Sequence, residues 1–342
     1  MRAVCFDVPP SICIKTMKKT LIAFLSILLA GFSMSSKPLS EIVARDPFIY
    51  ADVKSGWYYL YKQKPLSPES PTGGVEIYKS RDLMDWEGPV PVMTIPADNW
   101  ITGTIWAPEM HYYKGKYYIF GTVNTGLTWK GTRPEWPPYT YRGTQTFSSK
   151  SPEGPFCPVN KDGPVPPMTD MTLDGTLWVE DGIPYMVYCH EWVEVTDGTI
   201  EYVRMSKDLG RSISEPRVLF HASSAKWSNG DPDKYGTHYV SDGPFFYKSK
   251  TGDLLMIWSS FSHGRYAIGV ARSVTSRLAG PWIHEEEPIN KEDGGHGSIF
   301  KTFDGRLAIV FHTPNFGSPA HPVIYELIDE GSTLRIGDVI SR

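Results

Sequence analysis

Four residues able to transfer protons stand at intervals along the chain, each at the start of an apolar segment. They are Asp46, Asp174, Asp242 and His296. Carboxyl groups brought together in pairs can activate water and protonate a leaving group, which is the chemistry of glycosidic-bond hydrolysis. A single Asp at such a place is often a turn or strand-end residue. Three of them in one repeated setting favour a catalytic role.

Five segments of the chain share a pattern that would give these residues the same structural setting. Each segment opens with a short polar or glycine-containing motif, continues as an apolar strand, turns at Gly or Asp, and returns as an aromatic-rich strand. The segments are roughly 55–70 residues apart and open at Asp46, Trp106, Asp174, Asp242 and His296. The pattern predicts an all-β fold: a five-bladed β-propeller forming a single domain over residues 37–342.

The innermost strands of a propeller surround its axis, so the five openings should meet at one end of a central funnel. Three long segments interrupt the repeat, at residues 62–74, 125–141 and 221–238. Segments of this length inside a compact domain are usually functional or mobile. The second carries several aromatic residues and is interpreted either as a clamp between blades or as a wall of the binding site.

The composition narrows the classes of partner. Hydrophobic residues make up 41% of the chain and charged residues 21%, as in a globular domain with a core. The net charge of −4, without a long run of Lys or Arg, argues against nucleic acid. Aromatic residues reach 13%, which favours short strands and surfaces that stack on sugars or bases.

Residues 1–36 are predicted to contain an upstream extension and a signal peptide. Two lysines precede the apolar run at residues 21–32, which is shorter than the roughly 20 residues of a membrane span. Met17 lies directly before the lysines and is the predicted start. The mature chain would then begin near residues 33–37, be exported to the periplasm or the cell exterior, and have no stable membrane insertion.

The mature chain keeps two of the four cysteines, Cys157 and Cys189. They form either two buried thiols or one disulfide. A domain of this size does not need a cross-link for stability, so two unpaired core cysteines are the favoured interpretation.

Four short motifs at the blade openings form an ordered set. They are Ala44-Arg45-Asp46-Pro47, Trp106-Ala107-Pro108, Leu173-Asp174-Gly175-Thr176 and Gly294-Gly295-His296-Gly297. Their order and spacing resemble glycoside hydrolase family 43, the five-bladed propellers that act on arabinan, arabinoxylan and xylo-oligosaccharides. The resemblance covers essentially the whole mature chain and implies an oligosaccharide or polysaccharide substrate.

This resemblance implies a role for three of the residues. Asp46 would be the general base that activates water, and Asp174 would orient the general acid and tune its pKa. His296 would lie under the centre of the funnel, where many relatives hold Ca²⁺ or a water cluster, although the chemistry itself would require no cofactor. The implied enzyme is an inverting glycoside hydrolase, most similar to an α-L-arabinofuranosidase, with base and acid roughly 6.5–9.5 Å apart.

The fourth blade departs from the family pattern. Relatives carry the general-acid Glu in the motif that here reads Val240-Ser241-Asp242-Gly243-Pro244. Asp is shorter by one methylene, and a displacement of about 1 Å can lower a rate on the order of 100-fold. Either Asp242 supplies the proton, or Glu191 does, because it follows a returning strand that leads back to the funnel. The remaining candidates are His190, His263 and His312.

Three further residues are candidates for substrate binding, each beside a structural alternative. Trp106 is either a sugar-stacking platform or a core aromatic residue. Glu109 is either a hydrogen-bonding neighbour of the sugar or a structural residue. Arg265 either binds the orienting carboxylate or a sugar hydroxyl, or is a surface residue. The sequence thus predicts a secreted glycosidase, and the alternative is a non-catalytic sugar-binding propeller that has lost its general acid.

Overall fold

The computed structural model describes residues 36–68, 71–95, 101, 103–128, 130–131, 133–233, 235–317 and 319–342. The predicted signal peptide and upstream extension, apart from Ser36, lie outside these residues. Regular structure in the described residues is almost entirely β; the helical elements there are α1 (Trp192–Val195), η1 (Leu39–Glu41) and η2 (Ala222–Ser224). None of these is long and apolar enough to span a membrane. The predicted all-β class is confirmed.

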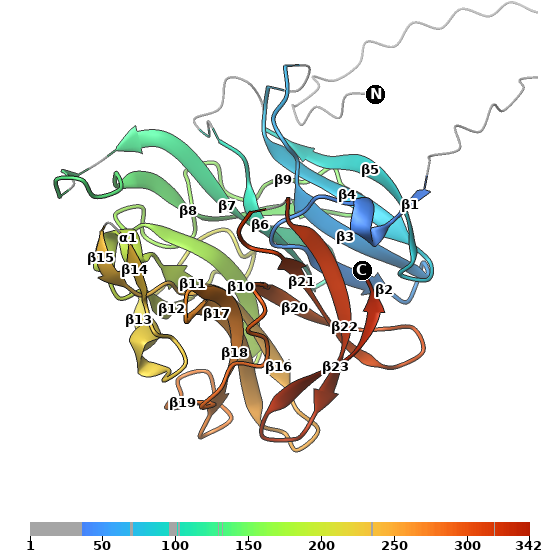
Figure 1. Cartoon of the computed structure of the whole chain (residues 1–342). Coiled ribbons are helices and arrows are strands. Elements are labelled where there is room, and N and C mark those ends of the chain that lie inside the picture. Colours follow the sequence, from blue (N-terminus) through green and yellow to red (C-terminus); the bar gives the residue numbers. More distant parts are fainter. Residues whose placement is uncertain are drawn as a thin grey trace, which may run out of the picture.

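The strands form five large sheets placed side by side around a common centre (Figure 1). The first sheet has the order β1 (Ser36–Pro38), β5 (Asp85–Thr94), β4 (Gly74–Ser80), β3 (Trp57–Gln63) and β2 (Phe48–Asp52). The second has the order β6 (Trp106–Tyr113), β7 (Lys116–Thr128), β8 (Thr140–Ser149) and β9 (Cys157–Pro158). The third has the order β10 (Thr172–Glu180), β11 (Ile183–His190), β12 (Thr199–Arg204) and β13 (Arg217–His221).

The fourth and fifth sheets follow the same plan. The fourth has the order β16 (Asp242–Lys248), β17 (Leu254–Ser262), β18 (Arg265–Ser273) and β19 (Trp282–His284). The fifth has the order β20 (Gly295–Lys301), β21 (Leu307–Thr313), β22 (His321–Asp329) and β23 (Leu334–Ser341). A separate two-stranded ribbon joins β14 (Asp231–Asp233) to β15 (Gly236–His238).

The innermost strands touch one another in a closed ring, which confirms the predicted five-bladed propeller. Contacts run from β2 to β6, β10, β16 and β20 in turn, and β20 returns to β2. In Figure 1 the first blade, in blue, accordingly lies beside the last, in red. Each blade is built from one continuous stretch of chain, so the ring is closed by packing between the first and last blades.

Apolar side chains fill all five interfaces between blades, and each interface has its own core cluster. Trp258 and Cys189 pack between the third and fourth blades, and Phe120 and Tyr188 between the second and third. The other three clusters join the first blade to the second, the fourth to the fifth, and the fifth to the first. Because most sheets are covered on both faces, their central strands are almost continuously apolar, as the aromatic-rich returning strands of the sequence indicate.

Candidate active site

The five blade openings share one backbone distortion. A residue with positive φ stands at each opening: Asp46 (48°), Ala107 (42°), Asp174 (55°), Gly243 (52°) and His296 (55°). In the second to fifth blades, the pairing of the inner strand with its neighbour also shifts register at this point. For residues other than glycine this conformation costs on the order of 1–3 kcal/mol and is concentrated at functional sites. Four such residues around one axis therefore mark the funnel as a functional region.

The position of the distortion shows that Asp242 is not equivalent to the aspartates that open the other blades. Asp46, Asp174 and His296 hold the positive-φ position, but Gly243 holds it in the fourth blade. Asp242 pairs with the next strand one residue before the distortion, as Trp106 and Leu173 do in their own blades. The prediction that three Asp residues are equivalent was thus wrong by one residue for Asp242, because Gly243 takes the left-handed conformation more readily than Asp.

Side chains from the preceding blade hold the distorted residues in place. The backbone N–H of Asp174 donates to Thr122 Oγ1 at 2.9 Å, and that of His296 donates to Ser259 Oγ at 2.8 Å. The N–H of Asp46 donates to His312 Nδ1 at 3.2 Å. All three acceptor residues are fully buried. The position of each candidate catalytic residue therefore depends on the neighbouring blade.

A cavity of about 400 Å³ opens at this end of the propeller. Six of the eight predicted site residues line it: Asp46, Trp106, Asp174, Glu191, Asp242 and His296. Residues that the sequence interpretation did not select as site residues line it as well, among them Arg45, Trp192, Phe261, Tyr266 and Asn315. The structure thus brings the candidate base and both candidate acids into one space.

His296 lies between carboxylates at the floor of the cavity. Its Nδ1 is 3.4 Å from Asp46 Oδ1 and 3.6 Å from Asp174 Oδ2. Burial opposes a charge on the ring, but Asp46, Asp174 and Asp242 together raise the pKa of His296. In turn, burial tends to raise the pKa of Asp46, but the nearby cations outweigh it and lower that pKa. Asp46 is therefore ionised, as a general base must be.

His312 also approaches Asp46, with Nδ1 at 3.3 Å from Oδ1, but this contact is not an ion pair. Burial lowers the pKa of His312 to about 4. Its Nδ1 accepts the backbone N–H of Asp46 and therefore carries no proton. The Nε2–H faces Asn315 Oδ1 at 3.3 Å. His312 thus acts as a neutral support for Asp46.

The other two aspartates of the cavity, Asp174 and Asp242, have pKa shifts opposite in direction to that of Asp46. Burial raises the pKa of Asp242 to about 6, against the opposing effects of His296 and of the Tyr266 hydroxyl. Burial, with repulsion from Asp242 and Asp46, also raises the pKa of Asp174. The backbone N–H of Gly243 donates to Asp174 Oδ2 at 3.3 Å, which links the third and fourth blades at this point. Both carboxyl groups stay protonated to a higher pH than a free Asp.

Glu191, the second candidate acid, is held by an arginine. Arg142 Nη1 donates to both carboxylate oxygens of Glu191, at 3.1 and 2.9 Å. Burial raises the pKa of Glu191 to about 7, although Arg142 opposes the shift. The guanidinium carbon of Arg142 is also 5.1 Å from the centre of the Trp106 ring. Arg142 thus connects Trp106 and Glu191, which both line the cavity.

Comparison with known proteins decides the family. Glycosyl hydrolases family 43 matches residues 35–326, most of the chain. The chain belongs to glycosyl hydrolase family 43. The family 43 assignment confirms the predicted enzyme class, an inverting glycoside hydrolase. No curated protein matches the sequence.

Solved structures resemble this family 43 enzyme over nearly their whole length. An endo-arabinase from Bacteroides thetaiotaomicron is 37% identical, with 86% of this chain and 98% of that chain covered and a TM-score of 0.75. A thermostable family-43 glycoside hydrolase is 25% identical, with 90% and 97% covered and a TM-score of 0.72. An α-L-arabinofuranosidase from Lactobacillus brevis is 19% identical, with 88% and 96% covered and a TM-score of 0.68, which shows the shared fold alone.

Two predicted binding residues of the family 43 enzyme do not line the main cavity. The side chain of Arg265 is 63% exposed, and its Nη1 is 3.5 Å from Glu292 Oε2. Glu109 accepts a hydrogen bond from Thr176 and lies 2.6 Å from His111 Nε2. Its carboxylate faces a second, much smaller cavity next to His296. Among the alternatives left open by the sequence, the surface role fits Arg265 and the structural role fits Glu109.

That second cavity is where Ca²⁺ was expected near His296. It measures about 10 Å³, and the ionisable side chains that line it are Asp46, Glu109 and His296. A Ca²⁺ ion takes about six to eight oxygen ligands, whereas this volume holds about one water molecule. The residues present therefore do not fit Ca²⁺ at this place, and no step of the chemistry is assigned to a metal.

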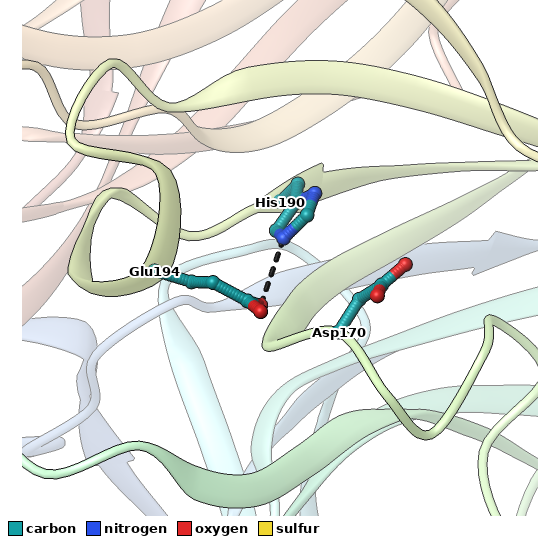
Figure 2. Close-up of side chains that lie close together, drawn as sticks. All are labelled: Asp170, His190 and Glu194. Atoms are coloured by element: carbon teal, nitrogen blue, oxygen red, sulfur yellow. Dashed lines mark hydrogen bonds and ion pairs between the residues drawn. The ribbon is translucent and has the colours of Figure 1, made fainter. Parts of the chain in front are cut away.

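His190 and His263 do not line the main cavity either. His190 Nε2 is 2.9 Å from Glu194 Oε2, and its Nδ1 is 3.1 Å from Glu201 Oε1. Burial opposes a charge, but these hydrogen bonds raise the pKa of His190 to about 9. Figure 2 shows His190 and Glu194 with Asp170, a grouping that could otherwise hold a metal ion. Both ring nitrogens of His190 are thus engaged by carboxylates, and the group is an ion-pair network.

The segment at residues 125–141 clamps two blades together. Its described part extends β7 and β8, and Trp136 Nε1 donates to Val193 O at 2.6 Å in α1. Arg133 Nη2 donates to Thr196 Oγ1 at 2.9 Å. None of the described residues of this segment lines the cavity, but it fixes α1, whose first residue Trp192 does.

Cys189 is a free, fully buried thiol, so it does not form a disulfide with Cys157. It stands on β11 opposite Leu173, at the same register position as Thr122 and Ser259 in their blades. The favoured interpretation of two unpaired core cysteines is confirmed for Cys189 and wrong for Cys157, which is half-buried and disulfide-bonded.

Proposed function

We propose that this family 43 enzyme removes terminal α-L-arabinofuranosyl units from arabinose-containing oligosaccharides and polysaccharides with inversion. One observation carries the proposal: the same cavity holds one carboxyl group whose pKa is lowered, Asp46, and carboxyl groups whose pKa is raised, among them Asp174 and Asp242. Such a pair separates the base from the acid at one pH. The 37% identity to a protein described as an endo-arabinase supports an arabinose-containing substrate.

We assign the general acid to Asp242. The Tyr266 hydroxyl donates to its Oδ2, and Oδ1 receives no hydrogen bond from the described residues. Arg142, in contrast, donates to both oxygens of Glu191, so neither oxygen of Glu191 is free to present a proton to the leaving group. Asp242 therefore has an oxygen free to carry the proton that leaves with the sugar. Glu191 then contributes to the charge and the shape of the cavity wall through its ion pair with Arg142.

Action at chain ends is supported by the size of the cavity. Its volume of about 400 Å³ is small for a binding site, given the range of about 300–1,000 Å³ for small-molecule sites. Trp192 and Phe261 line the cavity from different blades. A space of this size holds a short sugar segment more readily than the middle of a long chain.

We expect the purified protein to hydrolyse nitrophenyl α-L-arabinofuranoside faster than the matching xyloside or galactofuranoside. On linear arabinan the first product should be the monosaccharide, with the anomeric configuration inverted by NMR. Short oligosaccharides as first products would instead indicate internal cleavage. Binding of arabino-oligosaccharides by calorimetry without turnover of any glycoside would contradict the proposal and favour the sugar-binding propeller.

We also propose that the protein is exported to the periplasm or the cell exterior, and that hydrolysis needs no metal ion. Two lysines followed by the apolar run at residues 21–32 support export. Expression from Met17 should give processed protein outside the cytoplasm, with an amino terminus between about residues 31 and 37 by mass spectrometry. Recovery of Cys5 or Cys13 in the exported protein would contradict both the start site and the cleavage.

A further inference from the structure

A single buried phenol holds the candidate acid. Tyr266, near the start of β18, is 3% exposed, and its hydroxyl donates to Asp242 Oδ2 at 2.8 Å. The two residues belong to the same blade, because β16 pairs with β17 and β17 pairs with β18. The contact is therefore fixed by the internal register of one sheet and does not depend on a loop.

The ring of Tyr266 is fixed on several sides. It stacks on His312 with centroids 5.6 Å apart and packs against Phe261 at 5.4 Å. A Cβ atom placed on Gly295 would lie 2.3 Å from Cε1 of the Tyr266 ring. Gly295 does not have a positive φ, so its backbone would accept a side chain. The Tyr266 ring, with Ser259 Oγ at 3.1 Å from the same Cβ, leaves no room for one, and Gly295 thus provides the space that Tyr266 occupies.

We propose that Tyr266 is a positioning residue for Asp242. Its hydroxyl holds the Asp242 carboxyl group in the orientation needed for proton transfer, which the longer Glu side chain of relatives would reach without this support. This inference rests on the proposed function, in which Asp242 is the general acid. With Oδ2 held by the phenol, Oδ1 is the oxygen that carries the proton towards the glycosidic oxygen. A carboxyl group free to rotate would present that proton in only part of its conformations, which lowers the rate.

The proton balance follows from these contacts. The proton on Asp242 Oδ1 moves to the glycosidic oxygen as the bond to the anomeric carbon breaks. Water attacks that carbon from the opposite face and gives a proton to Asp46. Asp242 is left ionised, and the hydrogen bond from Tyr266 becomes a stronger, charge-assisted one. The phenol therefore stabilises the product of proton transfer more than the starting carboxyl group.

Removal of the hydroxyl should change the pH profile in a defined direction. The charged or titratable groups around Asp242 are His296, Tyr266, Asp46, Arg45, Asp174, Glu191 and Cys189. Among them, Tyr266 lowers the pKa of Asp242 by donating to its ionised form. Without this donor the pKa of Asp242 rises. Because the acid works in its protonated form, the basic limb of the kcat profile should move to higher pH.

The test is Tyr266→Phe, which keeps the ring and removes the hydroxyl. We expect kcat on an arabino-oligosaccharide to fall about 10–100-fold, as for the loss of one hydrogen bond to a charged group. A dinitrophenyl arabinofuranoside, whose leaving group needs little protonation, should be hydrolysed at nearly the original rate.

The matched control is Tyr188→Phe. Tyr188 is also fully buried and donates to a carboxylate, Glu201 Oε2 at 3.3 Å, but it does not line the cavity. Its loss should leave both rates and the pH profile unchanged. Equal losses on the two substrates with an unmoved basic limb for Tyr266→Phe would overturn the inference and leave Tyr266 a structural residue.

Asp242→Asn, measured in parallel, separates this inference from the proposed function. If Asp242→Asn discriminates between the two substrates and Tyr266→Phe does not, the positioning role alone is wrong. If Asp242→Asn does not discriminate, the acid assignment is wrong and the positioning role falls with it. Melting temperatures of all variants show whether a rate loss reflects unfolding.

Discussion

Asp46→Asn should lower kcat by about 10²–10⁴-fold, the usual contribution of a general base. The amide cannot accept a proton from the attacking water, and it removes the carboxylate that faces the His296 ring at 3.4 Å. The backbone contact to His312 involves the N–H of residue 46 and is retained in the variant. The measurement is kcat on an activated aryl arabinofuranoside, with thermal unfolding in parallel.

The control for this experiment is Asp52→Asn. Asp52 is buried at the far end of β2, the strand that follows Asp46, and accepts a hydrogen bond from the N–H of Lys54. Its replacement should leave kcat unchanged, whatever its effect on stability. Near-normal hydrolysis by Asp46→Asn would mean that another group activates the water, and the base assignment would be wrong.

The second large effect is expected at the general acid and depends on the leaving group. Asp242→Asn should abolish turnover of a natural arabino-oligosaccharide, whose leaving oxygen must be protonated. It should retain much of the activity on a dinitrophenyl glycoside, whose leaving group departs without a proton. The ratio of the two rates therefore identifies the acid, which a simple loss of activity does not.

Glu191→Gln is the comparison for that ratio. In the proposed arrangement it loses the ion pair with Arg142 and should affect both substrates alike. The reverse result, selectivity at Glu191 and none at Asp242, would move the acid to the third blade. If neither variant discriminates, both assignments are wrong and the sugar-binding alternative gains support.

The sequence was sufficient to predict the architecture because the repeat is local. Each blade is a continuous stretch, so the hairpin pattern that opens at Asp174 or His296 is visible without knowledge of the other blades. Closure of the ring then brings the openings together, and six of the eight predicted residues line one cavity. The one-residue error at Asp242 arose because Asp and Gly stand side by side there, and only the backbone angles show which of them is distorted.

Contacts between strands that are not adjacent in sequence could not be predicted in this way. Tyr266 resembles many other strand tyrosines in the sequence, and its importance follows from a hydrogen bond across one sheet. The supports Thr122, Ser259 and His312 act on the blade that follows their own. The Arg142 contact with Glu191 likewise joins two blades. An amphipathic or repeat pattern contains no information on such pairs.

The contact between the first and last blades determines at which stage of synthesis and folding the active site is complete. Asp46 comes from the first blade, but its backbone is held by His312 of the last, and the neighbouring Ala44 N–H donates to Ala320 O at 2.9 Å. The residue predicted to start the reaction is therefore among the first to leave the ribosome and among the last to be positioned. A chain still being synthesised would contain Asp46 without the fifth-blade residues that hold it. Catalytic activity should therefore appear only after the fifth blade has been synthesised and has packed against the first.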